Sequence, residues 1–351
     1  MDATLLVNLA LLLVALAVLV FSADKFVGGA EELGLVLGIP HFIMGITVLA
    51  VGTSFPELIT AIFAVKEGTS EIVIGTVVGS NIANILFILG LTAIFARDFT
   101  ITWDLLHGDL PMLFGSLLLL AFVVYPLSVD DIAAFQRFSS EVQPSGSLEL
   151  GRRAFVTVPE ALLLLFGYLL YLQYYSVRHR SEIARNGAGS AARPPFRLSP
   201  VVWMVLGLVG VLVGAKFTVD YAVRLALDLR IGNDVVAASM IALGTSMPEL
   251  VVSISAARRN NFELVLGNVT GSNIFNTFVV LGVPGVLAPF IGQQIPLKVG
   301  ETSVLFLQLP YYAATLLLFL VVVLDKTLTR TEGWVIFLAY VLFICKLFSF
   351  V

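Results

Sequence analysis

Apolar stretches long enough to cross a lipid bilayer, about 20 residues each, recur along the whole chain. Short polar segments separate them and leave no room for a soluble domain. The pattern therefore predicts an all-α membrane protein with ten transmembrane helices. The predicted spans lie at about residues 4–22, 39–65, 72–95, 105–125, 155–176, 200–226, 234–257, 263–289, 303–324 and 334–350.

Composition excludes a soluble globular fold. The chain has 351 residues, of which 58% are apolar and 13% are Asp, Glu, Lys or Arg, whereas soluble domains have roughly 45–50% apolar and about 25% charged residues. A net charge of −4 gives no sign of a nucleic-acid partner. The single cysteine, Cys345, excludes disulfide frameworks and cysteine-based metal sites.

The positive charges in the loops predict the orientation. With the N-terminus outside the cytoplasm, the cytoplasmic loops hold eleven Lys and Arg residues and the opposite loops hold seven. Positive residues favour the cytoplasmic side, so we expect both termini outside the cytoplasm and a multi-pass location in the cell inner (plasma) membrane. Asp2, with no Lys or Arg before the first span, argues against a cleaved signal peptide.

The segment 177–199 is rich in Arg, Gly, Ala and Pro, and it lies at the midpoint of the chain. Such a composition is typical of a flexible linker, and we expect it on the cytoplasmic side. It separates a first half, 1–176, from a second half, 200–351, with five predicted spans in each.

The two halves share an internal repeat. The sequence GTSFPEL at 52–58 is answered by GTSMPEL at 244–250, and GSNIAN at 79–84 by GSNIFN at 271–276. Both pairs are 192 residues apart, and eleven of the thirteen positions are identical. Five spans separate the copies, so the second copy enters the membrane in the opposite orientation. Inverted-topology repeats are typical of secondary transporters, whose binding site lies near the midplane where the halves meet.

The first motif predicts a broken helix in the second and seventh spans. Pro56 and Pro248 lack an N–H and clash with the carbonyl four residues earlier. Carbonyls of about Ala50–Thr53 and Ala242–Thr245 would then be freed, which is costly in hydrocarbon unless they line a cavity or bind an ion. Hydroxyl groups add further oxygens, on Thr53, Ser54, Thr245 and Ser246.

Two glutamates, Glu57 and Glu249, follow one helical turn beyond the motif threonines and on the same face. A carboxylate at this depth costs at least ~2.5–3.5 kcal/mol, so the pair predicts a cation or protons between them. Carboxylates, carbonyls and hydroxyls form an all-oxygen site that suits Ca²⁺ and also Na⁺. No Cys or His lies nearby, which argues against soft metals.

The second motif supplies polar side chains four residues apart in each half, namely Ser80, Asn84, Ser272 and Asn276. Gly79 and Gly271 are expected to let neighbouring helices approach closely. Asn81 and Asn273 project to a different face, and we interpret them as structural amides that satisfy the broken helices.

The chain carries no enzyme signature. It has no His-Glu-x-x-His motif, no His placed in a span to activate Ser54 or Ser246, and no glycine-rich nucleotide motif. We therefore expect no catalytic residue and no cofactor, and transport driven by an ion gradient rather than by ATP.

The doubled Gly-Thr-Ser-x-Pro-Glu with Gly-Ser-Asn resembles the two alpha-repeats of the sodium/calcium exchanger family, within the calcium/cation antiporter superfamily. The resemblance covers the ten-span plan, and its specific part is 50–90 and 242–282. It implies that Glu57 and Glu249 are the central Ca²⁺ ligands and also serve Na⁺. It also implies that the first and sixth helices slide against an eight-helix core.

The resemblance assigns roles to the other motif residues. Backbone carbonyls of Thr53 and Thr245 would complete the Ca²⁺ site, and Asn84 and Asn276 would line the centre. Flanking Na⁺ sites would be formed by the carbonyls of Ala50 and Ala242 with Thr53, Ser54, Ser80, Thr245, Ser246 and Ser272.

Two departures from the family pattern matter. Relatives that use potassium carry Asp where this chain has Asn276, which argues against K⁺ coupling. Animal exchangers insert large Ca²⁺-sensing domains between the halves, where this chain has about 23 residues. The prediction is a prokaryotic-type member without a regulatory domain, whose partners are Ca²⁺, Na⁺ and the lipid bilayer.

The predicted function is Na⁺/Ca²⁺ antiport by alternating access at a shared midplane site. An antiporter of H⁺ against Ca²⁺ or another divalent cation is the alternative, because the same two glutamates could carry protons. The ring of hydroxyls favours Na⁺, since protons need no such oxygens. A cation channel with the paired glutamates as its filter is a further alternative, against which the inverted repeat argues.

Overall fold

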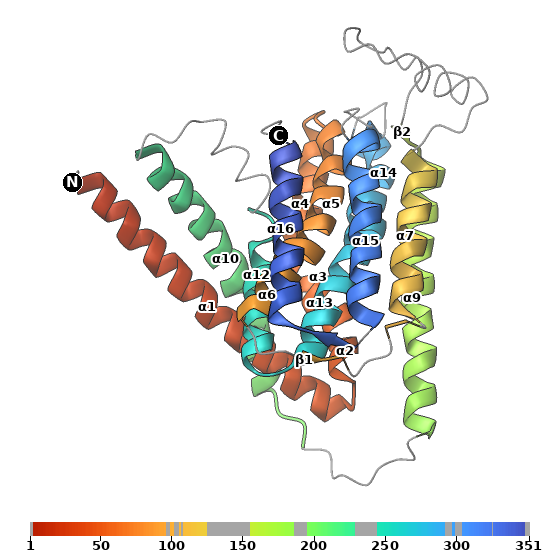
Figure 1. Cartoon of the computed structure of the whole chain (residues 1–351), viewed down its shortest axis with the longest axis horizontal. Coiled ribbons are helices and arrows are strands. Elements are labelled where there is room, and N and C mark those ends of the chain that lie inside the picture. The colour runs from red at the N-terminus through yellow and green to blue at the C-terminus, as the bar shows by residue number, and fades with distance from the viewer. Residues whose placement is uncertain are drawn as a thin grey trace, which may run out of the picture.

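The structure is a computed structural model that describes residues 3–95, 99–101, 105–106, 108–124, 155–185, 195–228, 244–291, 297–298, 304–324 and 326–347. Within these ranges the protein is almost entirely helical (Figure 1). Two short antiparallel β-ribbons link segments that lie between the helices. They pair β1 (Phe99–Thr100) with β4 (Thr327–Leu328), and β2 (Phe155–Val156) with β3 (Leu297–Lys298).

The helices follow the predicted spans in chain order. The first half contains α1 (Ala3–Leu37), α2 (His41–Met44), α3 (Ala50–Thr53), α4 (Phe55–Lys66), α5 (Glu71–Ala83), α6 (Gly90–Phe95), α7 (Asp109–Val124) and α9 (Val158–Arg185). The second half contains α10 (Ser199–Asp228), α12 (Met247–Arg258), α13 (Phe262–Phe275), α14 (Leu281–Leu287), α15 (Leu309–Leu324) and α16 (Arg330–Leu347). Short π-helical or 3₁₀ turns continue several of them, namely η1 (Gly45–Leu49), η2 (Asn84–Leu89), η3 (Asn276–Val280), η4 (Ala288–Ile291) and η5 (Val304–Gln308).

Five helical stretches in the described ranges are long and apolar enough to cross a membrane, in the predicted first, third, fifth, sixth and eighth spans. A sixth follows if the segments before and after Ser54, bent by 40°, count as one span. The shorter apolar helices α7 and α15 lie in the predicted fourth and ninth spans. Residues 234–243 of the predicted seventh span lie outside the described residues. The protein is therefore a predominantly helical membrane protein.

The helix α1 continues well beyond the predicted span 4–22. The apolar run ends near Ser22, but the helix continues through Gly28, Gly29 and Gly34 and ends only at Gly38, whose φ is 71°, two residues before Pro40. A left-handed glycine followed by proline commonly ends a helix. With 35 residues, α1 is about 52 Å long at 1.5 Å per residue, which exceeds the ~30 Å hydrocarbon core.

The helix α9 also continues past its predicted end at residue 176 and runs to Arg185, into the predicted linker. The residues there include Arg, Glu and Ala, which are good helix formers. Residues 186–194 of that linker lie outside the described residues.

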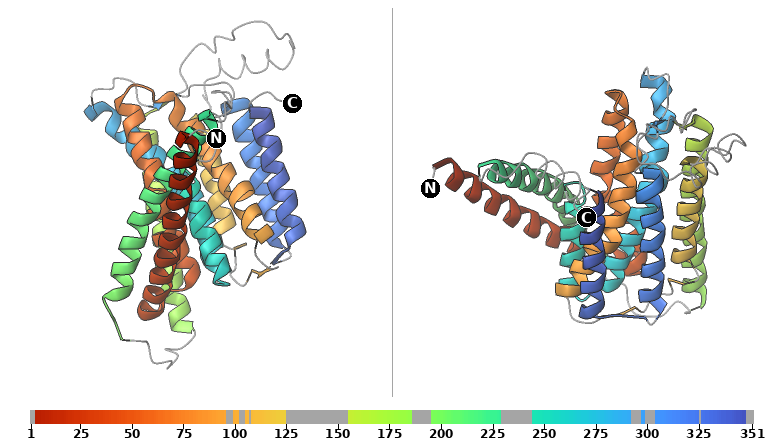
Figure 2. Two further views of the ribbon diagram at one scale, coloured as in Figure 1. Left: turned by 90° about the vertical axis from the view of Figure 1, so that its left-hand side faces the viewer. Right: turned by 45° about the horizontal axis from the view of Figure 1, so that its top comes forward.

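Helices α1 and α10 pack along each other, and their far ends project away from the other helices (Figures 1 and 2). Glycines of α10 make this close contact possible. At Gly214, for example, there is no room for a side chain, because a Cβ would lie 2.9 Å from the Leu19 backbone of α1. Near the projecting ends, Asn8 Nδ2 donates a hydrogen bond to Asp228 Oδ2 at 2.7 Å. Small residues let helices approach closely in membranes, so these two helices form one packed unit.

The centre of the remaining bundle is α13, whose residues from Leu264 to Phe275 are all buried. It contacts η1, α2 and α3 of the first half as well as α12 of the second. A Cβ on Gly267 would lie 2.9 Å from Gly45 Cα, so the two backbones touch directly. This packing brings the repeated motifs of both halves together inside the bundle.

Candidate ion-binding site

Two chain breaks with the same backbone geometry position the acidic side chains. Ser54 (φ −86°, ψ 6°) separates α3 from α4, and Ser246 (φ −88°, ψ 6°) precedes α12. Pro56 and Pro248 lie in the first turn of the following helix, where a missing N–H leaves no hydrogen bond unmade. The structure therefore confirms the predicted interruption before each proline.

The carbonyl groups before the first break differ from the prediction in one respect. Ala50 was expected to be freed, but its oxygen accepts a hydrogen bond from Ser54 N at 3.0 Å, so that prediction is wrong. The chain stays helical through Thr53. The carbonyl of Gly52 cannot accept the usual helical hydrogen bond from the residue four positions later, because that residue, Pro56, has no N–H. Ala242, the equivalent of Ala50, lies outside the described residues.

Glu57 and Glu249 occupy the first turns of α4 and α12, with 3% and 1% of their surface exposed. The two carboxyl groups lie near each other. Ser54 Oγ donates a hydrogen bond to Glu249 Oε1 at 2.9 Å, and the Thr245 side chain approaches the Glu57 carboxyl.

Three of the four oxygens of this pair lack a hydrogen-bond partner among the described residues, namely both of Glu57 and Oε2 of Glu249. The described ranges contain no group of three or more His, Cys, Asp or Glu side chains placed to hold a metal ion together. Two buried carboxylates with a single hydrogen bond for the pair and three unpartnered oxygens among the described residues are unstable unless a cation or protons compensate their charge. The arrangement can therefore hold cations through two carboxylates and neutral oxygens.

The second motifs of the two halves meet through their asparagines. Asn84 Nδ2 donates to Asn273 Oδ1 at 2.9 Å, and Asn273 Nδ2 donates to the Asn81 carbonyl at 3.2 Å. Asn81 Nδ2 donates to Thr277 Oγ1 at 2.9 Å. These bonds join α5 and η2 to α13 and η3, and none of them reaches the broken helices, so they do not confirm the predicted role of Asn81 and Asn273 in satisfying those helices. The π-helical turns η2 and η3 begin at the equivalent positions Asn84 and Asn276, and such turns are frequent at functional sites.

Other predicted ligands are also buried, and several of their polar atoms have no partner in the part of the chain that the structure describes. These atoms are Asn84 Oδ1, Ser272 Oγ and both polar atoms of the Asn276 amide. Thr53, Ser54, Ser80 and Ser246 are buried, and Thr245 is half-buried. An unsatisfied buried polar group costs about 1–3 kcal/mol, so a concentration of them indicates a ligand-binding position.

Asn268 of α13 is a central residue that the sequence analysis missed. Its Oδ1 lies 3.3 Å from Thr53 Oγ1, and its Nδ2 lies 3.0 Å from Ser253 Oγ and 3.5 Å from the Glu249 carbonyl. It therefore joins the first motif of one half to the first motif of the other. Its repeat equivalent is Thr76, so no repeated residue pointed to it.

The motif glycines differ from each other in their packing. A Cβ on Gly271 would lie 2.6 Å from Ile46 Cα and 2.8 Å from Ala50 Cβ, whereas a Cβ on Gly79 would have no described atom within 4 Å. The predicted close approach is confirmed for Gly271 and is wrong for Gly79.

A narrow cleft between α4 and α5 is lined by Glu57 and extends toward the turn that joins these helices. Its walls include the exposed residues Thr60 and Ile72. Their repeat equivalents, 192 residues further on, are Val252 and Leu264, and both are fully buried. Within the described residues, the cleft beside Glu57 thus opens between α4 and α5, while the equivalent α12–α13 positions are buried.

The sequence was compared with protein families and with known proteins. The model of the family described as "Sodium/calcium exchanger protein" matches residues 7–177 and 199–348. The chain is 33% identical to the sodium/calcium exchanger MaX1 of Methanosarcina acetivorans, over 97% of this chain and 99% of the relative. It is 33% identical to the inner membrane protein YrbG of Escherichia coli, over 82% of each chain.

Solved structures show the same fold. The sodium/calcium exchanger from Methanococcus jannaschii superimposes with a TM-score of 0.70 at 28% sequence identity, and the match covers 97% of this chain and 98% of that structure. The structure of the exchanger NCX_Mj soaked with Na⁺ and Sr²⁺ gives the same TM-score, identity and coverage. The chain therefore belongs to the sodium/calcium exchanger family.

Proposed function

We propose that this chain is a secondary active antiporter that exchanges Na⁺ for Ca²⁺ by alternating access at one shared site. The observation that carries the proposal is the buried pair Glu57 and Glu249, which comes from two repeated motifs and has three unpartnered oxygens within the described structure. The relatives named sodium/calcium exchangers support the choice of ions.

Charge balance explains how the two ions would compete. Two carboxylates are neutralised by one Ca²⁺ or by two Na⁺, and leaving them bare at bilayer depth is unfavourable. Each ion then leaves only when the other replaces it, which couples the two fluxes. Flexible all-oxygen coordination is what Ca²⁺ requires.

The motif residues take the following roles in this proposal. Glu57 and Glu249 hold Ca²⁺ with the carbonyls of Thr53 and Thr245, and the amides of Asn84 and Asn276 line the centre. Na⁺ binds at flanking positions formed by Ser54, Ser80, Ala242, Ser246 and Ser272 with the hydroxyls of the same two threonines.

The proposal includes ten spans arranged as two inverted five-helix repeats, with both termini outside the cytoplasm. The matching dihedral angles at Ser54 and Ser246 and the matching π-helical turns at Asn84 and Asn276 support the repeat. The chain would need no cofactor and catalyse no chemical reaction. The cell inner membrane is the proposed location.

Exchange of Ca²⁺ against protons is the second candidate, because the same unpartnered carboxylates could bind protons. The Ser54 hydroxyl at Glu249 and the Thr245 side chain near Glu57 favour Na⁺. A proton needs no such additional oxygens around it.

Uptake of ⁴⁵Ca²⁺ into proteoliposomes tests the proposal. Vesicles are loaded with Na⁺ or with choline, each with and without a pH gradient, and K⁺ is added in a further series. We expect uptake that requires internal Na⁺ and is indifferent to pH gradient and K⁺. Uptake that follows the pH gradient and ignores Na⁺ would identify a proton antiporter, and uptake without any counter-ion that does not saturate would identify a channel.

A further inference from the structure

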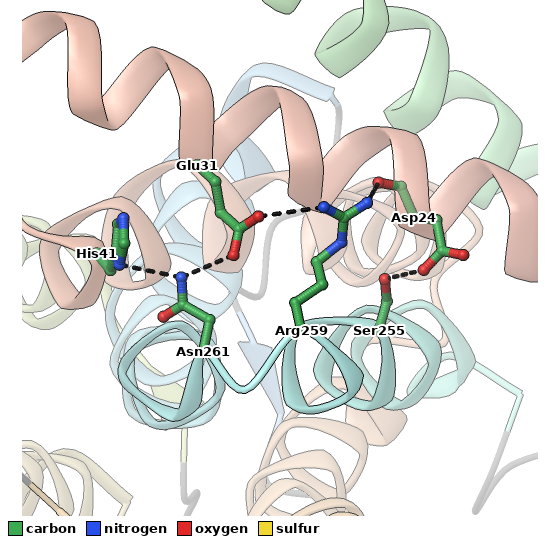
Figure 3. A network of polar contacts seen from close by, with 6 residues as sticks. All are labelled: Asp24, Glu31, His41, Ser255, Arg259 and Asn261. Carbon is green, nitrogen blue, oxygen red and sulfur yellow. Dashed lines mark hydrogen bonds and ion pairs between the residues drawn. The ribbon is translucent and has the colours of Figure 1, made fainter.

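A polar network joins α1 to the turn between α12 and α13 (Figure 3). On α1, Asp24, Gly28 and Glu31 follow one another at i, i+4 and i+7 and so lie on one face of the helix. Ser255 in the last turn of α12 and Arg259, the residue that follows this helix, are spaced by four residues and face α1. The ion-binding site uses none of these residues.

Arg259 makes the central contacts of the network. Its Nη1 lies 3.2 Å from Glu31 Oε2, and its Nη2 donates to the backbone carbonyl of Asp24 at 2.7 Å. Ser255 Oγ donates to the Asp24 carboxylate. Gly28 leaves the space for the guanidinium, because a Cβ there would lie 3.0 Å from Arg259 Nη2.

Asn261 extends the same network to the start of the broken span. Its Oδ1 accepts from Leu264 N at 3.3 Å and caps α13, so its Nδ2 faces the other way. That Nδ2 lies 2.8 Å from Glu31 Oε1 and 3.0 Å from His41 Nδ1. These two contacts join α1, α2 and α13 at one point.

The network lies at the end of the bundle opposite the cleft to Glu57. His41 begins the broken span and Lys66 ends it, so the contact of Asn261 with His41 places the α12–α13 turn at the far end from the α4–α5 turn. At this end α1 packs on α12, and α2 packs on α13. Opening the site toward the α12–α13 turn therefore requires these contacts to separate.

The repeat does not reproduce the network at the other end. The positions 192 residues before Ser255 and Arg259 are Phe63 and Glu67. In α10, the residues that match Asp24 and Glu31, in the register that pairs Lys25 with Lys216, are Ala215 and Ala222. Two alanines, a phenylalanine and a glutamate cannot form this set of ion pairs and hydrogen bonds. In the part of the chain that the structure describes, the positions equivalent to Asp24, Glu31, Ser255 and Arg259 therefore do not repeat this network at the α4–α5 end.

We propose that Asp24, Glu31, Ser255, Arg259 and Asn261 form a latch that holds α1 against the α12–α13 turn while the site is open toward the α4–α5 turn. The latch separates before ions reach the site from the α12–α13 side. Because it exists at one end, it biases the protein toward the conformation described here. This inference rests on the alternating access in the proposed function.

Thiol accessibility in the purified full chain tests the latch. In a Cys345→Ser background, Ala64→Cys places a reporter in the open cleft, and Ala256→Cys places one at the buried repeat equivalent. The rate of labelling by a water-soluble maleimide is measured with and without Arg259→Gln. We expect Arg259→Gln to raise the rate at Ala256→Cys by about fivefold, as for a partly exposed charged contact, and to lower the rate at Ala64→Cys.

Two further variants separate the latch from simple loss of structure. Arg258→Gln removes the same charge from an exposed neighbour outside the network and should leave both rates unchanged. Gly28→Ala displaces the guanidinium while favouring the helix, so it should reproduce the effect of Arg259→Gln. Equal labelling ratios for Arg259→Gln, Gly28→Ala and the parent overturn the latch. The readout needs no transported ion, so it is independent of the proteoliposome assay that tests the proposed function.

Discussion

Ser54 and Glu249 lie 195 positions apart in the chain, yet the Ser54 hydroxyl donates a hydrogen bond to Glu249 Oε1 at 2.9 Å. The hydroxyl belongs to the first copy of the repeated motif, and the carboxylate belongs to the second. Each half therefore supplies groups to the same site, and neither half forms the site by itself.

Replacing Ser54 by alanine removes a hydrogen-bond donor to the Glu249 carboxylate and one predicted Na⁺ ligand. A hydrogen bond to a charged group contributes roughly 1.5 kcal/mol or more, so we expect Ca²⁺ affinity to fall about tenfold. Equilibrium binding of ⁴⁵Ca²⁺ to purified protein measures the change. Ser176→Ala, which loses an exposed hydroxyl on α9, is the control and should bind as the parent does.

Replacing Glu57 or Glu249 by glutamine keeps the shape of the side chain and removes its charge. Because both carboxylates are needed to neutralise a divalent cation at bilayer depth, each substitution should abolish Ca²⁺ binding. Glu67→Gln removes a carboxylate from an exposed turn residue and should leave binding intact. Parental Ca²⁺ affinity in either site variant would refute the shared-site model.

The equivalent motif glycines Gly271 and Gly79 allow a controlled test of helix packing, because only Gly271 lies against another helix within the described residues. Gly271→Ala would drive a methyl group into Ile46 and Ala50, and overpacking of this kind costs about 1–3 kcal/mol. We expect a lower melting temperature and weaker Ca²⁺ binding, because the displaced segment leads directly to Thr53 and Ser54. Gly79→Ala should change neither property, and an equal loss of stability in both variants would contradict the packing described here.

Asn268→Leu tests the amide that joins the two halves. It removes the contact of the amide with Thr53 and leaves the Ser253 hydroxyl without its partner in the described contacts, and such an unsatisfied group costs roughly 1–3 kcal/mol. Thermal unfolding should show the loss of stability, and Ca²⁺ binding should weaken because Thr53 and Glu249 are no longer held together. Thr76→Val changes the repeat equivalent, whose hydroxyl bonds only within its own helix in the described contacts, and should have little effect.

Much of the site was predictable because its chemistry is costly in a membrane. Polar and charged residues such as Thr53, Glu57 and Asn84 stand out inside apolar spans, and their repetition 192 residues later marks them as a set. The interruption before Pro56 was predictable because proline cannot complete a helical hydrogen bond. The end of α1 was not, because the predicted span followed hydropathy, whereas the helix continued until Gly38 and Pro40.

By itself the sequence determined the membrane-type helical fold, the repeated motifs and the two acidic residues at their centres, because each depends on residue type and local spacing. Only the tertiary structure decided which residues from distant segments meet. Asn268 joins Thr53 to the Glu249 segment, and Arg259 reaches α1 at one end of the bundle alone. Such contacts depend on how close the backbones approach, and close approach is set by packing between helices that no local pattern records.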